Sequence, residues 1–259
     1  MSAPRVTLVG GPTALIEIDG FRLLTDPTFD PPGEYRLPYV TLRKTVGPAL
    51  MPNQIQPIDA VLLSHDQHAD NLDRAGRAFL AEAPRAFTTV AGATRLAGRT
   101  QGLAPWETAQ LSRPDGATLH LTSTPARHGP AGIEPLSGDV IGFVVESSNP
   151  STRPIYITGD TVWFAGVAEV SRRFPAGLVL LFAGSARTRG PFELTMNTND
   201  AIETAHAFAD ATIVPLHCDG WAHFTQGRDD LEASFRALGL QPRLQLLDPG
   251  VATSIRGYA

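Results

Sequence analysis

Side chains that can bind metal ions follow four apolar, strand-like segments of the sequence. The segments, each with the first such side chain after it, are 58–64 with His65, 119–123 with His128, 155–158 with Asp160, and 213–216 with His217. The ends of neighbouring buried strands converge in a folded protein, and the sheet holds the attached loops rigidly. Imidazole and carboxylate groups are ligands that suit Zn²⁺, Fe²⁺ and Mn²⁺. The pattern therefore predicts one metal site assembled from four distant parts of the chain.

The turn after the segment 58–64 is the densest of these donor groups. It reads His65-Asp66-Gln67-His68-Ala69-Asp70-Asn71. Taken by itself, this turn has two interpretations. Its side chains could bind one or two cations, or Asp70 or Asn71 could cap a helix that begins at Leu72. The donors in the other three turns favour the metal interpretation.

Further candidates lie near the predicted site or in regular elements. His223 follows closely after His217. It could donate a hydrogen bond to a substrate oxygen, or it could have a supporting role, either by contacting a metal ligand or by capping a helix. Cys218 is predicted to be a small buried hydrophobe rather than a nucleophile. His120 and His206 have the spacing of a strand face and a helix surface, and both are predicted to be structural.

The composition limits the class of protein. The chain has 259 residues and a formal net charge of −5 without a cluster of Lys and Arg, which argues against a nucleic-acid partner because such binding depends on phosphate neutralisation. The single cysteine excludes a disulfide framework and a cysteine-type zinc module. We find neither an apolar run of about 18 residues that could span a membrane nor a signal-peptide segment. We therefore expect a soluble, cytoplasmic enzyme, and no oligomeric state is indicated.

The segments that position these residues alternate between strand and helix patterns. We expect strands at 5–10, 13–18, 21–25, 58–64, 86–90, 118–123, 140–146, 154–158, 178–182, 212–216 and 244–247, and helices at 72–83, 91–99, 162–174, 199–209 and 229–238. The proline-rich stretch 26–57 is expected to be a functional loop or lid. Because no repeat or linker divides the chain, we predict a single domain over 1–259, with two β-sheets and helices outside them.

Five short motifs add a family resemblance. They are the opening strand pair at 9–17, Leu24-Thr25-Asp26-Pro27, the turn at 64–73, Pro125-Ala126-Arg127-His128, and Gly159-Asp160-Thr161. In this order they resemble the metallo-β-lactamase superfamily, specifically its branch with L-ascorbate-6-phosphate lactonase and N-acyl-phosphatidylethanolamine phospholipase D, nearly end to end. The resemblance implies an α/β fold, a four-layer αββα sandwich of two mixed β-sheets with helices on the outer faces.

The resemblance also implies a first metal position. The family signature His-x-His-x-Asp-His-Leu-Asp aligns with the turn in two ways, so that either His65 or Asp66 is the first ligand, together with His68 and His128. Asp160 would bridge to a second position or complete the first. Zn²⁺ is the expected metal, as one or two ions, with Mn²⁺ or Fe²⁺ as alternatives.

A second position is implied by the same comparison. Asp70 and His217 would hold a second ion or orient the attacking water, and Asp70 could carry a proton to the leaving group. Asn71 stands where the family has a histidine, and its neutral carbonyl is a weak ligand. This departure favours a single ion or a second position rich in oxygen ligands.

The function implied by the resemblance is hydrolysis of an ester, lactone or phosphodiester bond in a small molecule by a metal-activated hydroxide. Two other classes stay open: a mononuclear iron redox enzyme and a metal-poor binding protein of the same fold. Arg127, Arg187 and Arg189 are candidates to receive an anionic substrate group. Asp26 and Asp73 are expected to fix the orientation of metal-binding imidazoles.

Overall fold

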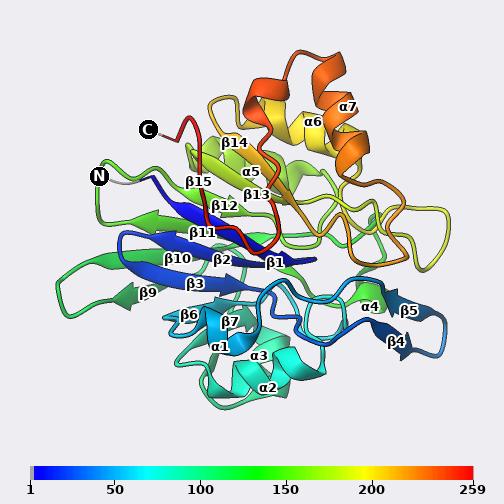
Figure 1. Ribbon diagram of the computed structural model, residues 1–259, viewed down its shortest axis with the longest axis horizontal. Helices are drawn as coiled ribbons and strands as arrows, with labels where there is room; N and C mark the ends of the chain where they lie inside the picture. Colours follow the sequence, from blue (N-terminus) through cyan, green and yellow to red (C-terminus); the bar gives the residue numbers. More distant parts are fainter. Residues whose placement is uncertain (1–2, 259) are drawn as a thin grey trace.

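Apolar segments near the N-terminus begin the first of two stacked β-sheets (Figure 1). The computed structural model describes residues 3–258. The seven strands of this sheet lie in the order β15 (Thr253–Ser254), β1 (Arg5–Gly10), β2 (Thr13–Ile18), β3 (Phe21–Thr25), β6 (Ala60–Leu62), β7 (Ala86–Thr89) and β8 (Thr100–Leu103). Strands β1 to β3 are antiparallel, whereas β3, β6, β7 and β8 are parallel. The sheet is therefore mixed, as predicted.

The second sheet brings the ends of distant strands to one edge. Its six strands lie in the order β14 (Thr212–Leu216), β13 (Leu178–Phe182), β12 (Ile155–Ile157), β11 (Ile141–Ser147), β10 (Thr118–Pro125) and β9 (Thr108–Ser112). Strands β10 and β12 both run antiparallel to β11, and β12, β13 and β14 are parallel. Strands β10, β12 and β14 consequently share one direction, and their C-terminal ends lie at the same edge of the sheet.

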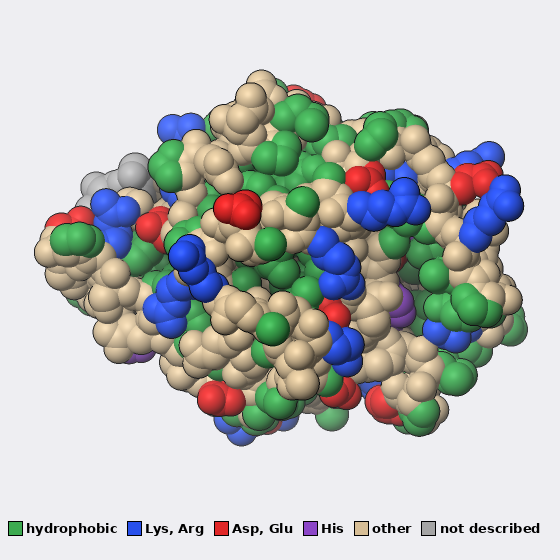
Figure 2. All heavy atoms as spheres, turned by 90° about the horizontal axis from the view of Figure 1, so that it is seen from below, with side chains coloured by type: hydrophobic (Ala, Val, Ile, Leu, Met, Phe, Trp, Pro, Cys, Tyr) green, Lys and Arg blue, Asp and Glu red, His purple; other side chains and the backbone are tan. Residues whose placement is uncertain are grey.

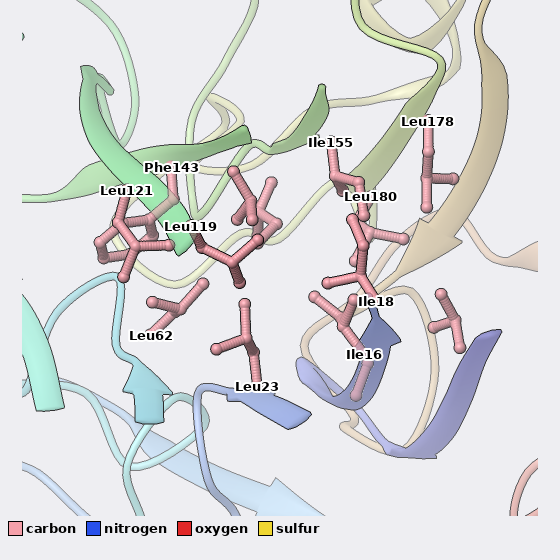
Figure 3. Packing of buried hydrophobic residues seen from close by; sticks show 14 of the residues in the cluster. Ile16, Ile18, Leu23, Leu62, Leu119, Leu121, Phe143, Ile155, Leu178 and Leu180 are labelled. Atoms are coloured by element: carbon pink, nitrogen blue, oxygen red, sulfur yellow. The ribbon is translucent and has the colours of Figure 1, made fainter. Parts of the chain in front are cut away.

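The main hydrophobic core lies between the two sheets (Figure 3). Ile16 and Leu23 point from the first sheet toward Leu119, Phe143 and Leu180 of the second. All five side chains are buried. Full burial of an aliphatic or aromatic side chain is worth about 1.5–3 kcal/mol, so this interface is a major source of stability and a rigid support for the loops at its edge.

Helices cover the outer face of each sheet (Figure 1). Those on the second sheet are α5 (Ala165–Arg173), α6 (Thr198–Ala207) and α7 (Arg228–Ala237), and those on the first are α1 (Pro52–Ile55), α2 (Arg74–Glu82) and α3 (Val90–Leu96). The short helix α4 (Glu134–Ser137) and the 3₁₀ helix at Gln241–Arg243 lie in connecting segments. The predicted αββα sandwich is therefore confirmed. Within residues 3–258, no helix combines the length and apolar character that crossing a bilayer would require.

Several elements differ from the sequence-based expectations. The stretch 26–57 is not an irregular loop throughout, because it forms the hairpin β4 (Gly33–Arg36) and β5 (Thr41–Lys44) and the helix α1. Strands β8 and β9 were not predicted, since both are short and half exposed. The strand predicted at 244–247 is wrong: Leu244 makes a single bridge to Ile213, and β15, paired with β1, is the last strand.

Candidate metal centre

Three histidines from two loops converge at the shared edge of the sheets. His65 and His68 lie in the turn that follows β6, and His128 follows β10. One ligand nitrogen from each lies within 4.8 Å of the others, and no other such group of three His, Cys, Asp or Glu side chains is found among the described residues. His65 Nε2 is 2.9 Å from His68 Nδ1. Three nitrogens this close can share one cation.

Hydrogen bonds on the far side of two imidazoles aim their free nitrogens into this cluster. Ser64 Oγ donates its only proton to Asp26 Oδ1 at 2.8 Å, so it accepts from His65 Nδ1 at 2.9 Å. His128 Nδ1 lies 2.8 Å from the carbonyl oxygen of Leu194, which can only accept. Both histidines therefore carry their proton on Nδ1 and present the Nε2 lone pair, as metal-bound histidines do. Asp26 acts on His65 through Ser64, in line with its predicted orienting role.

Asp160 lies between the three histidines and a second group of donors. Its Oδ2 is 3.9 Å from His65 Nε2 and 3.8 Å from His128 Nε2, and its Oδ1 is 3.5 Å from His217 Nε2. The preceding Gly159 has a φ of +60°, and a Cβ added there would lie 2.5 Å from the carbonyl oxygen of Ile141. Only glycine fits this turn, which sets the direction of the Asp160 carboxylate.

The second group joins Asp70, His217 and His223. Asp70 Oδ2 is 3.7 Å from His217 Nε2 and 3.0 Å from His223 Nε2. His217 directly follows β14 with a φ of 53°, a conformation that costs about 1–2 kcal/mol for a residue with a side chain. Such local strain is typical of functional positions, where the surrounding fold holds the residue in place.

Unsatisfied polar atoms indicate that this region suits a cation. Asp160 Oδ1 and both ring nitrogens of His217 are buried without a hydrogen-bond partner, and so are both polar atoms of the Asn71 side chain and Nδ1 of His223. Each such group costs about 1–3 kcal/mol when left unpaired in the interior. A divalent cation near Asp160 would satisfy the carboxylate oxygen and an imidazole nitrogen together. The residues present therefore fit a metal ion.

The electrostatics keep the donors in the form that metals require. Burial lowers the pKa of His65 well below its usual range and, with the neighbouring His128, lowers the pKa of His68 to about 4. Both imidazoles are neutral at pH 7. Burial opposes ionisation of Asp70 and Asp160, but the surrounding histidines outweigh it and hold the pKa of each carboxyl well below its ordinary value. For His217, burial lowers the pKa, but the negative charge of Asp160 raises it, and the net effect is a pKa above the ordinary value of histidine.

Asp66 is a predicted ligand that the structure does not bring into the cluster. Its two carboxylate oxygens accept from Arg95 of α3, at 2.9 Å from Nε to Oδ2 and 2.5 Å from Nη2 to Oδ1. Of the two alternatives for the first ligand, the geometry thus favours His65. The expected orienting role of Asp73 is also wrong, because Asp73 caps α2 and pairs with Lys44 instead.

The remaining predictions concern residues around the centre. Cys218 is buried, and burial raises the pKa of its thiol to about 12, which fits the predicted structural role. His120 and His206 are exposed on β10 and α6. The carbonyl of Leu194 was not foreseen, since a backbone oxygen leaves no signal in the sequence.

The centre lies under a narrow opening at the end of the molecule that carries the β4–β5 hairpin. A pocket of about 20 Å³, room for roughly one water molecule, is lined by Tyr39, Leu42, His68, Asp70, His128 and His223, among others. Figure 2 shows recessed histidine surface at this end of the molecule. The donors are therefore reachable from solvent although most are buried.

Comparison with known families identifies the class. A family model described as the beta-lactamase superfamily domain matches residues 21–218. The chain therefore belongs to the beta-lactamase superfamily, as the sequence motifs predicted. The particular branch with the lactonase and the phospholipase stays a prediction.

Individual relatives cover almost the whole chain. A protein named UPF0173 metal-dependent hydrolase from Methanopyrus kandleri is 25% identical over 255 residues, which is 95% of this chain and 97% of the relative. The crystal structure of an isothiocyanate hydrolase from Delia radicum gut bacteria superposes with a TM-score of 0.82 at 23% identity, over 97% of this chain and 99% of that one. A possible metal-dependent hydrolase from Veillonella parvula gives a TM-score of 0.83 at 19% identity, over 98% and 100%. These structures share the fold.

Proposed function

We propose that the protein is a metal-dependent hydrolase whose primary metal position is formed by His65, His68 and His128 with Asp160. The observation that carries this proposal is the convergence of these donors, most of them buried, from three separate loops. The name of the Methanopyrus kandleri relative supports it. Three imidazoles and a carboxylate are a typical zinc set, so Zn²⁺ is the expected ion.

A second position is proposed at Asp70, His217 and the other oxygen of Asp160. It is looser than the first, because among the residues that the structure describes only the three histidines have donor atoms that all lie within 4.8 Å of one another. Asn71 offers no imidazole there. A second ion would therefore be held mainly by oxygen atoms, which broadens the choice toward Mn²⁺ or Fe²⁺.

The chain itself supplies positioning and proton transfer. A bound divalent ion lowers the pKa of water from about 15.7 toward about 7 and stabilises negative charge that develops on the substrate. Asp70 and His223 line the pocket above it and hold one proton between them, at the hydrogen bond from His223 Nε2 to Asp70 Oδ2. This pair is placed to pass a proton to the leaving oxygen of a bound ester, lactone or phosphodiester.

The substrate is proposed to be a small molecule in the cytoplasm. The pocket above the metal position is narrow, which suits a small reacting group rather than a polymer. The isothiocyanate hydrolase of similar fold acts on another compact electrophilic carbon, so isothiocyanates join the compounds to be tested.

Metal analysis together with a hydrolysis screen tests the proposal. Protein purified from zinc-supplemented medium is expected to contain at least one zinc ion per chain and to hydrolyse a member of a panel of lactones, esters, isothiocyanates and bis(p-nitrophenyl) phosphate. Chelation should abolish activity, and added zinc should restore it. Full occupancy by iron without hydrolysis would favour the redox alternative, and a metal-free protein would favour a binding function.

Replacing His223 by glutamine tests the proton-transfer role. We expect kcat to fall by about 10²-fold, the lower end of typical general acid–base contributions, with the zinc content unchanged because His223 is not among the three clustered histidines. His206→Gln, on the exposed face of α6, is the matched control. A kcat within twofold of the wild type in His223→Gln would contradict the role.

A further inference from the structure

A second, wider cleft begins at His68 and runs away from the metal position. Its volume is about 430 Å³, and its walls include Tyr39, His68, Arg95, Leu136, Asp139 and Arg189. Because His68 lines both this cleft and the narrow pocket over the metal centre, the two spaces meet at this residue. The cleft is large enough for the remainder of a small substrate whose reacting bond lies in the narrow pocket.

The two arginines in this cleft differ in whether a carboxylate neutralises their charge. The guanidinium of Arg95 is bound at both carboxylate oxygens of Asp66, and Asp139 lies near enough to act on it electrostatically. Arg189 has no hydrogen bond or ion pair to any residue in the range 3–258, and its guanidinium carbon lies 3.8 Å from the centroid of the Tyr39 ring. The free positive charge in the cleft is therefore that of Arg189.

Stacking on Tyr39 prepares Arg189 to bind an anion. A guanidinium that lies on an aromatic ring uses its face for that contact, and its edge, with five N–H donors, stays available. Tyr39 lies at the tip of the β4–β5 hairpin and Arg189 in the segment that follows β13, so the stack joins two loops over the site. The stack also reduces the side-chain freedom that anion binding would otherwise have to remove.

We propose that Arg189, held by Tyr39, binds a carboxylate or phosphate group of the substrate at a distance from the bond that is hydrolysed. The enzyme would then act on anionic esters, lactones or phosphodiesters in preference to neutral ones. This inference rests on the proposed hydrolase function. Bidentate bonds from arginine to a carboxylate or phosphate fix both position and orientation, so this contact would also place the scissile bond beside His68.

Anion binding to the metal-loaded protein tests the inference without requiring turnover. Isothermal titration calorimetry with inorganic phosphate and with glutarate compares the wild type with Arg189→Met and Arg189→Lys. We expect Arg189→Met to raise the Kd at least about 10-fold for one of the two anions, since hydrogen bonds to charged groups are worth about 1.5–3 kcal/mol. Lysine should rescue part of the affinity, because it keeps the charge but loses the planar fork.

Arg187→Met is the matched control. Arg187 lies two positions away in the same segment, but its guanidinium is already bound to Glu193. Its substitution should leave the Kd within twofold. Equal Kd values for the wild type and Arg189→Met, or no measurable binding of either anion, would overturn the inference while leaving the metal content, and hence the proposed function, unaffected.

Turnover gives a second readout where the screen yields an ester substrate. With p-nitrophenyl butyrate and mono(p-nitrophenyl) glutarate as a neutral and an anionic pair, Arg189→Met should raise KM for the anionic ester about 10-fold and leave kcat/KM for the neutral ester unchanged. An equal effect on both esters would contradict recognition of the charge.

Discussion

Replacing His128 by alanine is expected to remove bound metal and hydrolytic activity together. His128 presents Nε2 to the cluster with His65 and His68, and Asp160 Oδ2 lies 3.8 Å from that nitrogen. Loss of one of three imidazoles leaves a primary position with two nitrogens and one carboxylate oxygen. We expect a fall in kcat/KM of at least about 10³-fold, because the acidity of the attacking water depends on the retained ion. Elemental analysis and the hydrolysis assay measure the two losses.

Two exposed histidines provide controls for this variant. His120→Ala and His206→Ala change the same side chain on β10 and on α6, away from the cluster, and should keep metal content and activity. The His128→Ala chain should still unfold cooperatively, because the sheets and their shared core do not include this side chain. Retained metal and activity in His128→Ala would remove His128 from the site.

The positions of the site residues could be predicted from the sequence because the end of each short apolar segment indicates where a buried strand ends. The segments that became β6, β10, β12 and β14 are short and apolar. Strands β10, β12 and β14 share one direction within the second sheet and end at one edge. The segment of β6, in the first sheet, ends beside them, because the amide of Ile141 in β11 donates to the carbonyl oxygen of Ser64. The donors that follow these strands therefore meet where the corresponding edges of the two stacked sheets lie side by side. The same reasoning could not choose between His65 and Asp66, since adjacent residues in a turn point in different directions.

The choice between these neighbours depends on tertiary contacts that the sequence does not display. Arg95, on a helix after the next strand, binds the carboxylate of Asp66, while Ser64 and Asp26 hold the ring of His65. The contact of His223 with Asp70 likewise joins residues 153 positions apart. Sequence reasoning placed His223 near the site through its neighbour His217, but could not give it this partner.

The β4–β5 hairpin was missed for a related reason. Its strands are short and rich in polar residues, and the seven prolines of the stretch 26–57 suppress any strand pattern. What holds the hairpin is remote: Lys44 forms a bridge with Trp221, and the amide of Thr45 donates to the carbonyl of Gly220 at 2.8 Å. A hairpin of this kind is stabilised by its place in the fold rather than by its own residues.

Replacing Asp73 by alanine is expected to lower the free energy of unfolding by about 4 kcal/mol. Asp73 and Lys44 are 0% and 4% exposed, and Lys44 Nζ lies 3.0 Å from Asp73 Oδ2. The same carboxylate accepts the amide protons of Phe29, Asp30 and Gly76, at 2.7–2.9 Å. Removing one partner of a buried ion pair leaves the other charge uncompensated, which costs about 3–5 kcal/mol. Urea denaturation followed by circular dichroism measures the change.

A comparison of variants distinguishes the loss of the buried ion pair between Asp73 and Lys44 from the loss of a single charge. Lys44→Met leaves the three backbone amides bound to Asp73, so it should destabilise less than Asp73→Ala, and the double variant should be more stable than the sum of the two losses predicts. Glu232→Gln, in the exposed pair with Arg236 on α7, should change the free energy of unfolding by less than about 0.5 kcal/mol. Additive losses would mean that the pair contributes no coupling. Because Lys44 belongs to the hairpin and Asp73 closes the turn that carries His65, His68 and Asp70, coupling between them would mean that the hairpin over the metal centre and the turn beneath it are stabilised as one unit.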